Sequence, residues 1–161
     1  MAIDVAGYRR IIGHFATGVT VVTTAVDGWL HGMTANAFAS LSLEPIQVLV
    51  CVDKTTHAHQ EFEKASHFGV NILAEDQEDL SNLFASKAPP EQGSLRGMTY
   101  HFGPNGTPIF EGALAYLECA VGDRLAGGDH TIFLGEVLDG DILREAAPLL
   151  FYQGRYRQME G

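Results

Sequence analysis

The feature that most constrains the fold of this chain is the close spacing of its β-prone segments. Val19–Val26 (VTVVTTAV) is dense in β-branched residues, and Asp27-Gly28 is a pair preferred in tight hairpin turns. Trp29–Thr34 is therefore expected to return antiparallel. Parallel strands need a long crossover between them, and these segments leave no room for one. The spacing favours a largely antiparallel β-barrel flanked by helices over a doubly wound parallel sheet.

More strands are expected along the rest of the chain. The apolar run Ile46–Asp53 is short enough for a buried strand, whereas Ala35–Leu43 is ambiguous by pattern. The other segments of strand composition are His67–Leu73, Thr99–Phe102, Ala113–Ala120, His130–Leu138 and Leu149–Arg157. The stretch from Pro89 to Gly97 is expected to be an exposed and mobile loop. The sequence thus predicts a mainly β domain of about seven or eight strands.

Three short helices complete this prediction. Asp4 can cap a first helix, which Gly18 ends. The apolar residues of this helix recur at the helical period and are Val5, Tyr8, Ile11, Ile12 and Phe15. Thr56–Lys64 and the acidic segment Asp76–Ala85 are expected to form the second and third helices.

Length, charge and cysteine content limit the class of protein. The 161 residues are expected to form one domain, residues 1–161. Ten Lys and Arg against 20 Asp and Glu give a net charge of −10, which argues against nucleic acid or an anionic membrane as partner. Cys51 and Cys119 stand far apart in apolar runs and are expected to be reduced core thiols. We therefore expect a cytoplasmic protein.

Several catalytic motifs are missing from the sequence. It contains no G-x-G dinucleotide fingerprint, no phosphate-binding P-loop, no G-x-S-x-G, no C-x-x-C and no H-E-x-x-H. His57 and His59 could form a metal pair, but no third ligand of matching spacing is visible, and no metal is expected. The absence of these motifs argues against motif-based hydrolases, zinc proteases and nucleotide kinases as the class of this protein.

Three polar clusters within apolar sequence remain as candidate sites. The small residues of His31–Pro45 would let a flat ligand approach the backbone, or they form a turn-rich barrel corner. Asp53–His57 leads into a helix whose N-terminus could attract phosphate, although ordinary N-capping by Thr55 or Thr56 explains the same residues. Gly127–His130 brings a histidine to the start of a strand, either as a proton donor or as a hydrogen-bonded rim residue.

Taken in order, these clusters resemble the short-chain flavin reductase family, the reductase components of two-component flavin monooxygenases. The resembling stretches are FATGVTVVTT (Phe15–Thr24), GMTANAFASLSLEP (Gly32–Pro45), VCVDKTTHA (Val50–Ala58), FGVNIL (Phe68–Leu73), GGDHTIFLGEV (Gly127–Val137) and LLFYQGRY (Leu149–Tyr156). Each stretch alone is a weak indication of the family, but the six stretches occur in the family's order and the resemblance covers nearly the whole chain. The resemblance implies an FMN-binding split β-barrel, usually a homodimer with flavin near the subunit interface.

The resemblance also implies where FMN or FAD binds. The residues expected to border or line the flavin ring are Thr34, Ala35, Asn36, Ser40, Leu41 and Ser42. Those expected to hold the flavin phosphate are Lys54, Thr55, Thr56 and His57, with Ser86 as a further contact. Backbone N–H groups beside the ring would stabilise the negative charge that develops on it during reduction.

The implied reaction is hydride transfer from NADH or NADPH to the flavin. His130 matches the histidine that this family places on the nicotinamide side of the site, as the catalytic residue. Tyr152, Arg155 and Tyr156 match the segment that closes over the flavin or the nucleotide, with Arg155 as partner for a dinucleotide phosphate. The family's usual role implies a partner oxygenase that receives the reduced flavin as an exchangeable ligand.

Two other functions would use the same fold. A non-catalytic flavin-binding electron carrier or redox sensor would hold FMN tightly and would not turn over pyridine nucleotides. It would have no need of His130 or of the Tyr152–Tyr156 segment. An oxidase of the pyridoxamine-phosphate type ranks last, since no further basic cluster is present for a second phosphate-bearing substrate. Because all three functions use the same fold, only the residues of the site distinguish between them.

Overall fold

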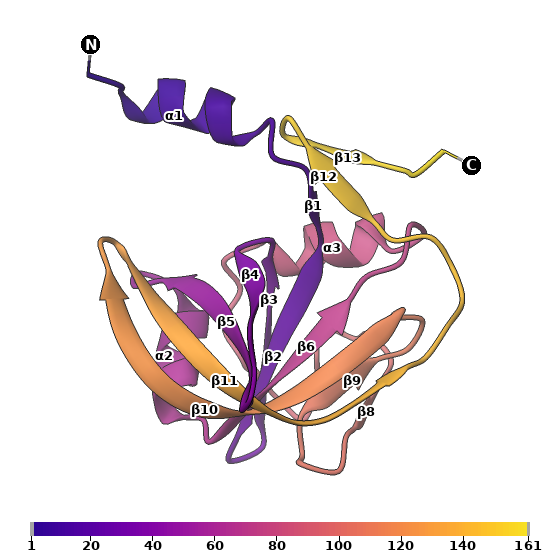
Figure 1. The fold of residues 1–161 in the computed structure, drawn as a ribbon. Coiled ribbons are helices and arrows are strands. Elements are labelled where there is room, and N and C mark those ends of the chain that lie inside the picture. Colours follow the sequence, from indigo (N-terminus) through magenta and orange to yellow (C-terminus); the bar gives the residue numbers. More distant parts are fainter. Residues whose placement is uncertain (1, 161) are drawn as a thin grey trace.

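An eight-stranded antiparallel sheet dominates the computed structural model, which describes residues 2–160 (Figure 1). Its strands are β2 (Thr20–Val26), β3 (Trp29–Ala35), β4 (Phe38–Leu43), β5 (Ile46–Asp53), β6 (His67–Ile72), β7 (Glu91–Gln92), β10 (Ala115–Gly127) and β11 (His130–Ile142). They lie in the order β4-β5-β11-β10-β6-β2-β3-β7, so β4 and β7 are the ends of a sheet that does not close.

The smaller sheets lie beside this main sheet. β1 (Thr17–Gly18), β12 (Leu150–Tyr152) and β13 (Arg155–Arg157) form a three-stranded antiparallel sheet, which joins the two ends of the chain. β8 (Tyr100–Phe102) pairs with β9 (Pro108–Phe110). The predicted mainly β, antiparallel fold is therefore confirmed.

Three helices flank the sheets, as predicted: α1 (Val5–Ile12), α2 (His57–Lys64) and α3 (Glu78–Phe84). The Asp4 side chain caps α1 by accepting a hydrogen bond from the Gly7 N–H at 2.7 Å. Leu80 and Phe84 of α3 are buried, as the amphipathic pattern of that segment indicates. None of the helices within residues 2–160 has the length and apolar character needed to span a membrane.

Two apolar clusters form the core. One lies between α2 and the main sheet, where the rings of Phe68 and Phe133 lie 5.1 Å and 4.9 Å from that of Phe62. The other lies under α3, where the ring centroid of Phe84 is 5.1 Å from that of Phe110. Both helices are thus packed against strands, and their ends are fixed relative to the sheet.

The structure corrects the expectation for the first helix. α1 ends at Ile12 instead of running to Gly18, because Thr17 and Gly18 pair with β12. Its apolar face is not buried within the chain. The exposed fractions of its apolar residues are 67% for Val5, 55% for Tyr8, 63% for Ile11 and 47% for Ile12, and Phe15 beyond it is 72% exposed. Figure 1 shows α1 projecting from the rest of the molecule.

Other boundaries also differ from the predictions. The segment from Pro89 to Gly97 is an exposed loop only in part. Pro89, Gly93 and Gly97 are exposed, but the segment contains the two-residue strand β7 and its Leu95 is only 2% exposed. β10 and β11 each have 13 residues and run past their predicted ends. The added end of β10 pairs with the start of β11 (Arg124 opposite Phe133 to Gly127 opposite His130), and the added end of β11 pairs with the start of β10 (Asp139 opposite Glu118 to Ile142 opposite Ala115). Leu149–Arg157 is divided into β12 and β13 by a turn at Gln153-Gly154, where both residues have positive φ.

Candidate functional site

A cavity of about 470 Å³ lies between β3, the start of α2 and the end of α3. Its lining residues are Val19, His31, Met33, Thr34, Asn36, Thr55, Thr56, His57, Ala58, Ser81, Phe84, Ala85, Ser86, Lys87, Ala88, Phe151 and Tyr156. Apolar walls with a few convergent polar groups are typical of small-molecule sites.

Hydrogen bonds between distant segments hold the walls of this cavity together. The Thr34 hydroxyl donates to the Ser81 carbonyl at 2.6 Å, which ties β3 to α3. The Ser81 and Tyr156 hydroxyls lie 2.6 Å apart, which ties α3 to β13. Tyr156 also packs edge-on against Phe151, with 5.4 Å between ring centroids. The cavity is therefore preformed by contacts within one chain.

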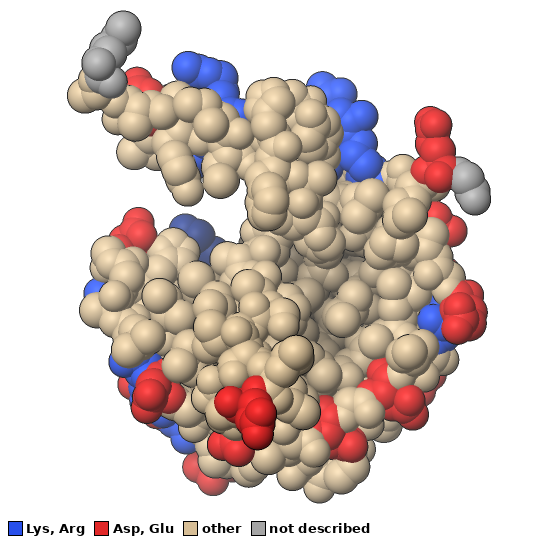
Figure 2. All heavy atoms as spheres, in the orientation of Figure 1, with Lys and Arg blue, Asp and Glu red and all other residues tan. Residues whose placement is uncertain are grey.

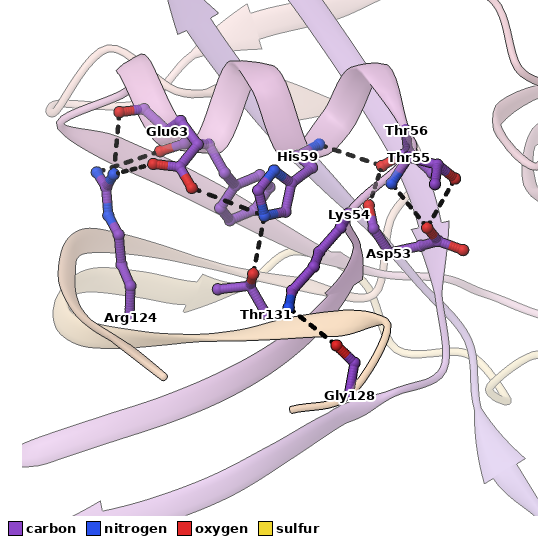
Figure 3. A network of polar contacts seen from close by, with 10 residues as sticks. Asp53, Lys54, Thr55, Thr56, His59, Glu63, Arg124, Gly128 and Thr131 are labelled. Atoms are coloured by element: carbon purple, nitrogen blue, oxygen red, sulfur yellow. Dashed lines mark hydrogen bonds and ion pairs between the residues drawn. The ribbon is translucent and has the colours of Figure 1, made fainter. Parts of the chain in front are cut away.

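The segment between β5 and α2 contributes Thr55 and Thr56 to one end of the cavity. Figure 3 shows the polar contacts of this segment. The Thr56 hydroxyl caps α2 by accepting from the His59 N–H at 3.2 Å. The Asp53 carboxylate accepts from both the backbone N–H and the hydroxyl of Thr55, each at 2.8 Å. These bonds lower the pKa of Asp53, and electrostatic interactions with His130 and Lys87 add smaller effects in the same direction. Ordinary capping is therefore present, and Lys87 brings a cation to the same cavity.

The pairing of β5 with β11 brings the β10–β11 turn to this segment. Asp53 lies opposite His130 in the register of the two strands. The Lys54 backbone N–H donates to the Asp129 carbonyl at 3.0 Å, and its ammonium group donates to the Gly128 carbonyl at 2.9 Å. His130 is partly exposed, and its Nδ1 lies 2.8 Å from Asp129 Oδ1. An imidazole is thus presented beside the strand end that leads into the cavity.

Two contacts from α2 hold the same hairpin in place (Figure 3). His59 Nε2 lies 2.8 Å from the Thr131 hydroxyl, next to His130 in sequence. Further along, the Arg124 guanidinium of β10 donates to the Glu63 carboxylate at 2.6 Å. The hairpin that carries His130 is therefore fixed to the helix whose start lines the cavity.

His31 is a buried histidine in the cavity wall. It is 9% exposed, and its Nε2 lies 3.3 Å from the Ala88 carbonyl. Burial lowers its pKa below the ordinary 6.5, the bond to Ala88 opposes this shift, and the charge of His57 adds to it. The cavity therefore contains a histidine that stays neutral at neutral pH.

The structure brings half of the predicted flavin-contacting residues together. Those that line the cavity are Thr34, Asn36, Thr55, Thr56, His57, Ser86 and Tyr156. Lys54 and His130 lie beside the end of the cavity that the start of α2 forms. Ala35 is buried next to the lining residues of β3.

The other predicted residues lie outside the cavity of the single chain. Ser40, Leu41 and Ser42 are on β4, at one end of the main sheet. Tyr152 and Arg155 flank the turn between β12 and β13, and the Tyr152 ring faces the Arg157 guanidinium at 5.8 Å. These assignments stay predictions.

Sequence reasoning missed several lining residues, above all His31, Ser81 and Lys87. Lys87 directly follows the predicted Ser86, and a cation at that place was a usable signal. Ser81 lies on the inner face of α3 beside Leu80 and Phe84, and its burial among apolar residues could have marked it. His31 begins the cluster of small residues, but only the packing of the loop at Ala88 encloses it.

A comparison with protein-family models decides the identity of the domain. Residues 12–160 match the model described as a flavin reductase like domain. The chain belongs to the flavin reductase family. The split-barrel fold expected from the resemblance agrees with this family and with the solved structures that are similar to the chain.

Named relatives support this membership. The reductase subunit HsaB of a flavin-dependent monooxygenase from Rhodococcus jostii is 40% identical over 159 residues, which are 99% of this chain and 80% of that protein. The solved structure of the flavin reductase PheA2 is 39% identical with a TM-score of 0.88, and the match covers 99% of this chain and 100% of that one.

A third relative has been solved with ligand fragments. It is the NADH:FAD oxidoreductase SgcE6 of Streptomyces globisporus, in complex with NAD and FAD fragments. That structure is 39% identical with a TM-score of 0.90, and the match covers 98% of this chain and 93% of that one. All three of these relatives are named as reductases or as an oxidoreductase.

The buried His31 predicts a pH dependence of stability. Its folded pKa lies below its unfolded pKa, so the unfolded chain binds the proton more readily. Its contribution is fully present above about pH 6.5 and is lost as the pH falls through the folded pKa. Urea unfolding should show that the free energy of unfolding of the parent protein falls between about pH 7.5 and about pH 5.5. In His31→Gln this fall should be smaller.

The matched control is His101→Gln, because His101 is an exposed histidine on β8. It should retain the pH dependence of the parent protein. An unchanged pH dependence in His31→Gln would show that burial of this imidazole is not coupled to folding.

Proposed function

We propose that this protein is an NAD(P)H-dependent flavin reductase, which transfers hydride from a nicotinamide dinucleotide to FMN or FAD and supplies the reduced flavin to a partner monooxygenase. The observation that carries the proposal is the preformed cavity. The start of α2 forms one end of this cavity, and its walls are mainly apolar. The membership of the flavin reductase family supports the same reaction.

The cavity has the chemistry that a flavin requires. Met33, Phe84 and Phe151 offer apolar contact to a flat ring system. Thr55 and Thr56 at the start of α2 offer backbone N–H groups and hydroxyls to a phosphate, and Lys87 adds a positive charge. In a chain of net charge −10, such local cations are needed to hold an anionic nucleotide.

Flavin, when bound, supplies the group that accepts a hydride from reduced nicotinamide. The residues of this chain then have to bind and orient two rings and exclude water, and no protein nucleophile is needed. The Thr34–Ser81–Tyr156 hydrogen bonds keep the cavity walls rigid for this purpose. His130 lies at the adjacent hairpin end, opposite Asp53, and this position supports our assignment of His130 to the nicotinamide side.

We further propose that the protein is a homodimer. The apolar residues of α1 are exposed in the single chain, and a second copy of the chain is the partner that would cover them. Figure 2 shows that Lys, Arg, Asp and Glu lie mainly around the rim of the face beneath α1, while its centre is largely uncharged. Low charge at the centre and charge at the rim are typical of protein–protein interfaces.

The reaction is tested by measuring NADH and NADPH oxidation with and without added FMN or FAD. Turnover that requires flavin and saturates with flavin concentration is expected. Flavin binding without turnover would instead favour an electron carrier or sensor, and absence of flavin binding would contradict the proposal.

His130→Ala should lower the rate of flavin reduction and leave the Kd of the flavin within a few fold. The reason is that His130 lies beside the cavity at the end of the hairpin and does not line it. Stopped-flow reduction under anaerobic conditions gives the rate, and flavin fluorescence gives the Kd. Collapse of flavin binding would identify His130 as a flavin-binding residue instead.

Lys54→Ala should weaken FMN binding by ~1–3 kcal/mol, the usual loss for a charge-assisted hydrogen bond. Lys54 directly precedes Thr55 and Thr56, and its ammonium group donates to the Gly128 carbonyl of the β10–β11 turn, so a phosphate at the start of α2 would compete with that carbonyl for it. Arg144→Ala is the control, because this cation pairs with Asp76 and the Gly112 carbonyl and makes no contact with the segment between β5 and α2. Equal affinities for FMN in Lys54→Ala and the parent protein would place the phosphate elsewhere.

Ile11→Asp should convert the dimer to a monomer, because it puts a charge in the apolar face of α1. Light scattering after gel filtration should give twice the chain mass of 17.4 kDa for the parent protein and the chain mass for the variant. Arg9→Ser on the same helix is the control and should remain dimeric. A monomeric parent protein would contradict the proposal.

A further inference from the structure

A second cavity of about 470 Å³ lies next to the first, between α2 and the turn that joins β2 to β3. It is lined by Val26, Asp27, Trp29, His57, Gln60, Glu61, Lys64 and Pro90. Apart from His57 and Asp27, its lining residues belong to none of the motifs singled out in the sequence, and the reaction described above does not use the cavity.

The two walls of this cavity differ in chemistry. One wall is a polar face of α2, because His57, Gln60, Glu61 and Lys64 recur at the helical spacing. The other wall contains the indole of Trp29, the only tryptophan in the chain, and this side chain is 45% exposed. A flat aromatic surface opposite groups that donate and accept hydrogen bonds suits a heteroaromatic base.

His57 connects the two cavities, since its side chain lines both. The first cavity ends at the start of α2, where the flavin phosphate is proposed to bind. A ligand that continues past this phosphate along α2 therefore enters the second cavity.

The charged residues that line the second cavity are two carboxylates and one ammonium group, and this balance disfavours an anionic group inside it. Asp27 and Glu61 are carboxylates, and Glu61 is only 6% exposed, with the Lys64 ammonium 3.9 Å away. A phosphate inside this cavity would be repelled by both carboxylates. An exocyclic amine of a base, in contrast, would find acceptors in them.

We propose that the second cavity binds the adenine of FAD, stacked on Trp29, while the flavin ring occupies the first cavity and the diphosphate lies at the start of α2. This inference rests on the proposed function. It makes FAD the preferred flavin, because FMN fills the first cavity alone. It also makes Trp29 a residue that determines specificity between the two flavins.

The test compares the Kd of FAD with the Kd of FMN in the parent protein and in Trp29→Ala. Loss of one base–aromatic stacking contact should weaken FAD binding by about tenfold. FMN binding should change by less than about twofold, because FMN does not reach Trp29. Trp29→Phe, which keeps a ring at the site, should restore most of the FAD affinity.

The matched control is Phe102→Ala, which removes another exposed aromatic side chain, on β8 and outside both cavities. It should leave both flavin affinities unchanged. Equal losses for FAD and FMN in Trp29→Ala, or no loss for either, would overturn the adenine assignment. An increase in the KM for NADH with FMN as the flavin, without loss of FAD affinity, would assign the cavity to the other dinucleotide and also overturn it.

The parent protein gives a second readout that does not depend on the folding of a variant. Because Trp29 is the only tryptophan, its fluorescence reports on this cavity alone. Addition of 5′-AMP should quench this emission, and FAD but not FMN should compete with 5′-AMP. Emission that 5′-AMP leaves unchanged would contradict the proposal. If the parent protein bound neither FMN nor FAD, the proposed function itself would fail.

Discussion

The antiparallel pairing of β5 with β11 is the constraint on which the site depends. It places Asp53 opposite His130, so that the segment leading into α2 and the turn of the β10–β11 hairpin lie at the same end of the sheet. Because side chains alternate between the faces of a strand, a shift of one residue would turn both strand ends away from their partners. The Lys54 bonds to the carbonyls of Gly128 and Asp129 hold the register at this end.

The cavity walls depend on contacts between segments that are distant in sequence. Ser81 of α3 connects Thr34 of β3 with Tyr156 of β13, and these three residues span most of the chain. His31 is enclosed only because the chain after α3 brings the Ala88 carbonyl against it. A rigid scaffold of this kind suits a protein whose contribution to hydride transfer is the orientation of bound rings.

Local patterns predicted the elements that depend on local physics. The Asp27-Gly28 turn, the strand Ile46–Asp53 and the capped start of α2 all follow from short-range propensity and agree with the structure. Local patterns offered a signal for Ser81 and Lys87, but the enclosure of His31 could not be predicted in this way, because it depends on the distant segment that brings the Ala88 carbonyl against it. The apolar face of α1 was visible in the sequence, but periodicity does not distinguish a core from a surface that a second chain would cover.

The central claim is that the cavity between β3, α2 and α3 holds the flavin, and a crystal structure of the protein with bound FMN tests it most directly. The account predicts the flavin ring between Met33, Phe84 and Phe151, with its phosphate at Thr55 and Thr56. Flavin bound outside this cavity, with the phosphate remote from the start of α2, would contradict the account.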